Sequence, residues 1–186
     1  NVSCSPFLMG LCGQEGIGVS FLTENGRFLA RVHGPQSGNI LLRRSQHTAT
    51  NDEKCSAVVA SNMVSAKIAN SRVLLQRCVR DHGEKINVEY VQWSIRRLKR
   101  LLALIRRQTD LVGVRALEAD AARAYFRMFN ELIVIEDKVF RFNGRTRRPP
   151  LDRVNAMLSF LYAIVTHDIT AACECAGLDP QMGFLH

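Results

Sequence analysis

The chain has 186 residues, 47% of them hydrophobic, which is enough for one sizeable core or for one domain with a smaller module attached. No apolar run approaches the ~20 residues of a membrane span, so we do not expect a membrane protein. The 25 Lys and Arg residues outnumber the 17 Asp and Glu residues, and the net charge of +8 favours a polyanionic partner. The six cysteines lack the C-x-x-C spacing of a zinc or redox site, and nothing marks export, so free thiols are expected.

The first predicted element is a β-hairpin in GVSFLTENGRFLARVHG, because Asn25-Gly26 is the strongest short signal for a two-residue turn. The residues before it, NVSCSPFLMGLCG, have no initiator methionine and no basic segment, so we expect a chain that is cut and not processed at this end. The expected cross-strand pairs are Val19 with Val32, Phe21 with Ala30, Leu22 with Leu29, Thr23 with Phe28, and Glu24 with Arg27.

Two short stretches after the hairpin predict the end of a first domain. NILLRR is interpreted as a third strand, and the polar SQHTATND as a linker. Residues 1–48 are therefore predicted to form an incomplete N-terminal β module, and residues 49–186 an α-helical domain. The predicted fold class is α+β.

Helical spacing of apolar residues predicts three helices over about 52–81, 88–107 and 114–135. Pro149 and Pro150 suit the entry of a fourth, which we expect to end near Cys175 before Gly177. This fourth helix is apolar almost all round, which predicts that it is central and the most buried. The expected buried stripes are Cys55, Val59, Met63, Ala66, Val73 and Cys78 in the first helix, Ile95, Leu98, Leu102 and Ile105 in the second, and Leu117, Ala121, Tyr125, Met128 and Leu132 in the third.

Longer strings carry a resemblance to a known family. They are GVSFLTENGRFLARVHGPQSGNILLRRSQH, MVSAKIANSRVLLQR, LEADAARAYF and FNGRTRRPPLDRVNAMLSFLYAIVTHDITAACECAGLDPQMGFLH. These strings closely resemble the CRISPR-associated endonuclease and integrase Cas1, with the type I-C branch as the nearest match. The resemblance spans nearly the whole chain, in order.

The resemblance implies a metal site at Glu118 and His186, which would be the catalytic residues. Glu118 lies in ALEAD, where the family has a glycine-x-glutamate-glycine motif, and His186 ends the family's string GFLH. Taken alone, Glu118 is an ordinary solvated helix glutamate near Arg115, and a terminal histidine has no assigned role. One oxygen and one nitrogen donor suit Mg²⁺ or Mn²⁺. The family's further acidic ligands would follow His186, so weak metal binding is expected of these residues alone.

The resemblance also implies DNA binding, which the basic charge supports. A run of basic residues can also be a plain solvated face. Asn155 and Tyr162 could contact DNA or brace Glu118, or they could only satisfy buried backbone groups or each other. The expected DNA-binding residues are Arg145, Arg147 and Arg148 in the loop FNGRTRRPP and Arg96, Arg97, Arg100 and Arg107 on the second helix.

The implied activity is insertion of spacers into a CRISPR array, by attack of a spacer 3′ hydroxyl on a repeat phosphodiester. The expected partners are double-stranded and branched DNA, a second copy in a homodimer, Cas2 and a Cas4 nuclease, in the cytoplasm of a prokaryote. Two alternatives remain from the residues: a non-catalytic or degenerate basic DNA-binding module, and a helical adaptor for an acidic protein.

Overall fold

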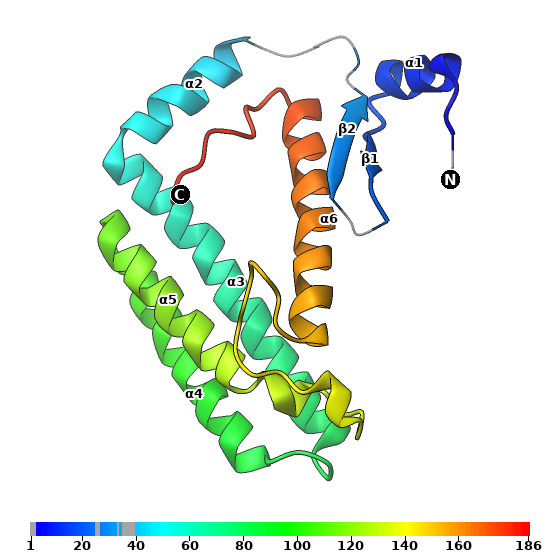
Figure 1. Ribbon diagram of the computed structural model, residues 1–186. Coiled ribbons are helices and arrows are strands. Elements are labelled where there is room, and N and C mark those ends of the chain that lie inside the picture. Colours follow the sequence, from blue (N-terminus) through cyan, green and yellow to red (C-terminus); the bar gives the residue numbers. More distant parts are fainter. Residues whose placement is uncertain (1–2, 25–26, 33, 35–39) are drawn as a thin grey trace. The chain divides into compact units, whose positions relative to one another are not determined.

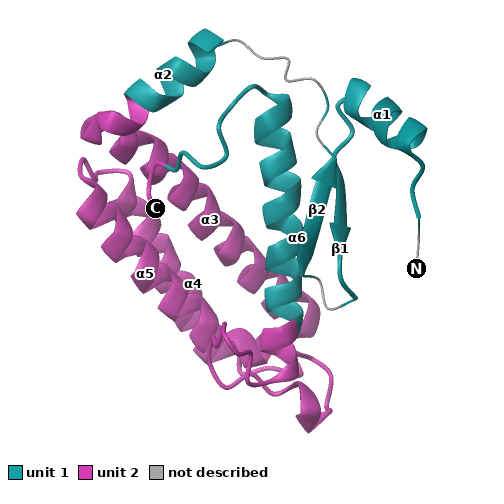
Figure 2. Cartoon of the chain, turned by 45° about the horizontal axis from the view of Figure 1, so that its top comes forward, with its two compact units in different colours: residues 1–48, 157–183 teal, residues 49–156, 184–186 magenta. Residues whose placement is uncertain are grey.

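The computed structural model describes all residues except 1–2, 25–26, 33 and 35–39. Its contacts divide the chain into two compact units (Figure 2), one of residues 1–48 with 157–183 and the other of residues 49–156 with 184–186. Helices dominate both units, and one two-stranded antiparallel sheet accompanies them, which confirms the α+β class (Figure 1). The domain boundary at residue 48 stays a prediction. All six cysteines are free thiols.

The predicted hairpin is present in the first unit, although its turn residues 25–26 lie outside the described part. Strand β1 (Val19–Leu22) runs antiparallel to β2 (Phe28–Val32), with the predicted pairs of Val19 with Val32 and Phe21 with Ala30. The pairing shifts after Phe21, so that Leu22 pairs with Phe28 and not with Leu29. The register is therefore confirmed except beside the turn, where an irregularity of the β-bulge kind changes the partner.

The predicted strand NILLRR is wrong, because this segment begins helix α2 (Ile40–Asn51). Leucine and arginine are good helix formers, and a helix satisfies its backbone hydrogen bonds without a neighbouring strand. The polar stretch predicted as a linker continues the same helix. The chain leaves it at Asp52, and a helix that the sequence did not predict, α1 (Pro6–Gln14), precedes the hairpin and is capped by Ser5.

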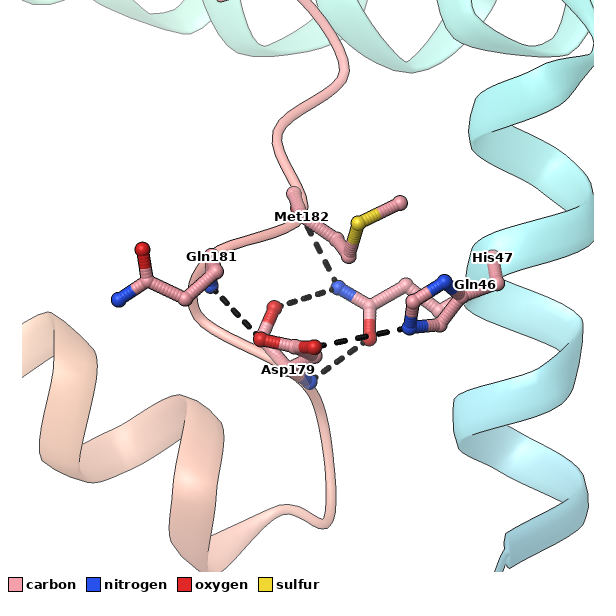
Figure 3. A network of polar contacts seen from close by, with 5 residues as sticks. All are labelled: Gln46, His47, Asp179, Gln181 and Met182. Atoms are coloured by element: carbon pink, nitrogen blue, oxygen red, sulfur yellow. Dashed lines mark hydrogen bonds and ion pairs between the residues drawn. The ribbon is translucent and has the colours of Figure 1, made fainter.

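A polar network in the first unit fixes the loop after helix α6 (Arg153–Cys175) to α2 (Figure 3). The Gln46 side chain donates through Nε2 to the backbone oxygens of Asp179 (2.9 Å) and Met182 (3.3 Å), and its Oε1 accepts from the Asp179 backbone N–H (2.8 Å). The Asp179 carboxylate lies 3.5 Å from His47 Nε2. One amide side chain thus makes hydrogen bonds with three backbone groups of the loop.

Helix α6 ends as predicted, with Gly177 at a positive φ of 78° just after it, but the prediction that it is the most buried helix is wrong. Its buried residues are Val154 and Asn155, while Met157 and Ile169 are 56% and 58% exposed. An apolar side chain is buried only if another element covers it, and in the first unit the hairpin supports α6 on one side, where Phe28 stacks on His167. Among the described residues, α6 is the one helix long and apolar enough to cross a membrane, on length and composition alone.

The second unit is built on three helices, α3 (Glu53–His82), α4 (Val88–Ile105) and α5 (Leu111–Arg127). Each begins where a side chain accepts a hydrogen bond from an otherwise unpaired backbone N–H: Asp52, Asn87 and Asp110. The first two helices match their predicted ranges. The third starts three residues early and ends at Arg127, followed by the 3₁₀ turns η1 (Phe129–Leu132) and η2 (Lys138–Phe140).

The helices of this unit pack through one apolar cluster that includes Ile68, Leu98, Ile105 and Met128. The predicted stripe of α3 is wrong in part, because Met63 is 61% exposed. The α3 face that packs carries small residues, which let the helices approach closely, and polar ones among them are satisfied: Ser61 Oγ donates to the Ile105 backbone oxygen at 2.8 Å. The other misplaced residues of that stripe are Val73, 56% exposed, and Ala66.

Candidate active site

The structure brings Glu118 and His186 together in the second unit. Glu118 lies on α5 with its side chain 18% exposed, and its Oε2 is 3.5 Å from Nε2 of His186. Its other oxygen, Oε1, accepts a hydrogen bond of 2.6 Å from Nζ of Lys67 on α3. The carboxylate therefore joins two segments that are far apart in the sequence.

Arg115 holds the chain just before His186. Its Nε and Nη2 donate to the backbone oxygen of Leu185 at 2.9 and 2.6 Å, and the Leu185 side chain packs against the apolar cluster. The His186 side chain itself is 74% exposed. From the sequence, Arg115 was named only as a neighbour of Glu118. Because Arg115 lies three positions before Glu118 on the same helix face, the spacing could have indicated that it belongs to the site.

The second residue that sequence reasoning missed is Lys67, which lies on another helix and has no local signal. Burial acts to raise the pKa of Glu118, but the hydrogen bond and charge of Lys67, with a smaller contribution from His186, outweigh it and hold that pKa below its ordinary value. Glu118 is thus an ionised carboxylate under neutral conditions, as a metal ligand must be.

The donor types fit a divalent cation such as Mg²⁺ or Mn²⁺, which accept carboxylate oxygen, and Mn²⁺ also imidazole nitrogen. Within the described ranges no group of three or more His, Cys, Asp and Glu side chains gathers at one point. Glu118 and His186 would hold the ion. The ammonium of Lys67 would compete with the ion for the Glu118 carboxylate. That ion would neutralise phosphate charge and activate a hydroxyl.

Asn155 organises the arginine-rich loop before α6. It is fully buried, and its Nδ2 donates to the Gly144 backbone oxygen at 2.8 Å while its Oδ1 accepts from the Thr146 N–H at 3.0 Å and from Arg145 Nη1 at 2.9 Å. These bonds connect Asn155 to the loop and not to Glu118. Its predicted role of bracing Glu118 remains a prediction. Its contacts position the loop that carries Arg145, Arg147 and Arg148.

Asp152 caps the start of α6 and gives a pH-dependent prediction. Burial acts to raise its pKa, but hydrogen bonds from the Asn155 backbone and side chain, and from backbone N–H groups nearby, outweigh burial and lower that pKa. A lowered folded pKa stabilises above the unfolded value and is lost as the pH falls through the folded value. We expect Asp152→Ala to reduce the free energy of unfolding by about 1 kcal/mol at neutral pH.

Urea denaturation of both proteins at neutral pH and at about pH 2 measures this difference. It should become smaller at the lower pH, because the charge of the Asp152 carboxylate is lost as the pH falls through its lowered pKa. A difference that stays the same at both pH values would contradict the assignment of Asp152 as a charged cap.

The loop arginines border a groove of about 570 Å³ between α5 and the segment after it. Arg145 and Arg147, both predicted to bind DNA, meet here with two arginines of α5 that were not predicted. The α5 arginines follow Glu118 by five and nine positions, a spacing that sequence reasoning did not use. The lining residues are Ala122, Arg123, Phe126, Arg127, Asn130, Phe142, Gly144, Arg145 and Arg147.

The predicted helix arginines do not act as one set. Arg97 pairs with the carboxylate of Asp120, so part of its charge is neutralised. Arg96, Arg100 and Arg107 are exposed. Tyr162, 53% exposed, belongs to the first unit, and its predicted bracing role remains a prediction.

Comparison with known proteins decides the family. The family described as CRISPR associated protein Cas1 matches residues 1–186. The chain belongs to the Cas1 family. A curated relative, CRISPR-associated endonuclease Cas1 1 of Chlorobaculum tepidum, is 50% identical over 185 residues, which are 100% of this chain and 54% of the relative. This Cas1 chain thus spans about half the length of the curated relatives it matches.

Two solved structures have a fold similar to that of this Cas1 chain. The first is a partial Cas6-RT-Cas1–Cas2 complex, with a TM-score of 0.69 and 26% identity over 98% of this chain and 53% of that one. The second is a casposase bound to an integration product, with a TM-score of 0.73 and 22% identity over 98% and 49%. At that identity, the casposase shows the fold alone.

Proposed function

We propose that this Cas1 chain carries the Glu118 and His186 metal ligands of a DNA endonuclease and integrase that inserts spacers into a CRISPR array. The observation that carries the proposal is the contact between Glu118 Oε2 and His186 Nε2 in a Cas1-family chain. The strings ALEAD and GFLH led us to expect that both residues are metal ligands. The two residues lie 68 positions apart in the chain.

The chemistry follows from the residues that are present. The 3′ hydroxyl of a spacer attacks a phosphodiester at the edge of a repeat, and the displaced 3′ oxygen of the repeat strand leaves in line. Glu118 and His186 would hold the divalent ion of this step through a carboxylate oxygen and an imidazole nitrogen. Arg145, Arg147 and Arg148 would bind the phosphates of the DNA through charge-assisted hydrogen bonds, independent of sequence.

The assembly is part of the same proposal. The relative in the Cas6-RT-Cas1–Cas2 complex supports Cas2 as a partner. A homodimer, a Cas4 partner, the type I-C branch and a place in the prokaryotic cytoplasm follow from the family resemblance and remain proposals. The substrates in this proposal are duplex and branched DNA.

A strand-transfer assay tests the proposal. The chain as printed, and a longer protein made by extending it to the length of its curated relatives, are each incubated with a labelled spacer duplex and a repeat-bearing plasmid, with Mn²⁺ or Mg²⁺ and with chelator. Metal-dependent joining by the longer protein is the expected result. DNA binding without joining or nicking under any metal condition would favour the second candidate, a non-catalytic DNA-binding module.

The second candidate has one observation in its favour, which is the ammonium of Lys67 on the carboxylate that should hold the metal. We expect Lys67→Met to strengthen Mn²⁺ binding by about 2- to 5-fold, since an ion pair of this exposure contributes about 1 kcal/mol or less. Isothermal titration of the chain with Mn²⁺ measures the affinity. Lys54→Met, an exposed lysine on the same helix, is the matched control and should leave it unchanged. Weaker binding by Lys67→Met would show that Lys67 supports the site.

A further inference from the structure

A second groove in the second unit has no part in the proposed reaction. It lies where the beginning of α4 meets the end of α5, and its volume is about 430 Å³. Asn87, the cap of α4, is at its edge. The lining residues are Asn87, Glu89, Tyr90, Trp93, Arg96 and Arg127.

Aromatic rings and a guanidinium group form the centre of this groove. The guanidinium carbon of Arg127 lies 5.3 Å from the centre of the Trp93 ring and 5.5 Å from the centre of the Tyr90 ring. Arg127 Nε also donates to Tyr90 Oη at 2.9 Å. These contacts hold the side chain in one place, and in the described part of the chain its two NH₂ groups have no hydrogen-bond partner. The group is thus oriented and still able to bind an anion.

The charge and the exposed ring indicate what the groove would bind. The lining residues include two exposed arginines, Arg96 and Arg127, and one carboxylate, that of Glu89, so their summed charge is positive. The carboxylate of Glu131 accepts a hydrogen bond from the Asn87 N–H at 2.8 Å. Trp93 is 38% exposed although it is large and apolar. Arginines beside an accessible aromatic ring bind single-stranded nucleic acid, because every base can stack on the ring while the arginines contact its phosphates. The bases of a duplex are already stacked on one another and offer no free face.

Arg127 also lines the groove beside the arginine-rich loop, together with Arg123, Arg145 and Arg147. Phe126 and Phe142 lie along that second groove, with ring centres 5.8 Å apart. Aromatic and basic side chains thus line both grooves.

We propose that the Tyr90, Trp93, Arg96 and Arg127 groove binds an unpaired DNA strand, with a base stacked on Trp93 and phosphates on the two arginines. The inference deepens the proposed function, since it names the form of DNA that this part of the chain holds. It needs neither Glu118 nor a metal ion. Binding and strand transfer can therefore fail separately.

Trp93 is the one tryptophan of the chain, so its fluorescence reports on this groove directly. The 186-residue chain is titrated with oligothymidylate of about 12 nucleotides and with a duplex of the same length. The expected result is saturable quenching by the single strand and little or none by the duplex. Binding of a dye-labelled single strand, followed by anisotropy, should weaken about 10-fold or more in Trp93→Leu and clearly in Arg96→Gln.

Controls make each outcome decisive. Lys54→Gln removes one positive charge from an exposed lysine near the other end of the bundle and should leave anisotropy unchanged within about 2-fold. If the labelled strand binds but Trp93 emission and the Trp93→Leu affinity do not change, the groove assignment is overturned while the proposed function stands. Equal quenching by polyglutamate would overturn it in favour of an acidic protein partner. If neither DNA binds, both proposals fail.

Discussion

Glu118→Gln in the longer protein is expected to lower the rate of metal-dependent strand transfer by on the order of 100-fold or more. The glutamine keeps the size of the side chain but removes the charge that would hold the ion, and even outer-shell partners of a metal typically contribute 10- to 100-fold. Glu118 contacts both Lys67 and His186, so the substitution acts where the ion would be held. A gel assay of labelled spacer joining, at saturating Mn²⁺, measures the rate.

The control for this prediction is Glu84→Gln, which removes an exposed carboxylate outside the helices of the second unit. It should keep wild-type activity. Thermal unfolding of both variants shows whether the fold is intact. Wild-type strand transfer by a folded Glu118→Gln protein would remove Glu118 from the site and with it the main support for the proposed function.

Leu98→Ala is expected to cost about 2–5 kcal/mol of unfolding free energy, the usual range for a leucine removed from a packed interior. Leu98 is fully buried at the centre of the cluster that joins α3, α4 and α5. Urea denaturation of the chain measures the loss.

Leu104→Ala is the matched control for the packing prediction. Leu104 lies on the same helix but is 46% exposed, so the same truncation should cost well under half as much. Equal losses in the two variants would mean that the buried face of α4 is assigned wrongly.

The limits of the sequence are clearest in α3 and α6. The range of α3 was predicted within one residue at each end, yet Met63 and Val73 were placed on its buried face and are exposed. In α6 the apolar character was read correctly and the burial was not. The sequence shows which side chains are apolar. Which of them are buried depends on the elements that pack against them.

The candidate site divides in the same way. Glu118 and His186 were predicted from the family strings, but the contacts that Lys67 and Arg115 make at this site were not. Lys67 reaches Glu118 from 51 positions away, and Arg115 holds the backbone of Leu185 from 70 positions away. The same holds for the aromatic groove, where Arg127 of α5 meets Tyr90 and Trp93 of α4.

What the sequence by itself determined is local. The helix starts at Asp52 and Asn87, the end at Gly177 and the register of the hairpin away from its turn follow from interactions within a few residues. The basic charge follows from composition. The tertiary structure alone decided which face of α3 is buried, how far α6 is exposed, and which cations reach Glu118. These depend on packing between distant segments, whose contact energies no short stretch of sequence contains.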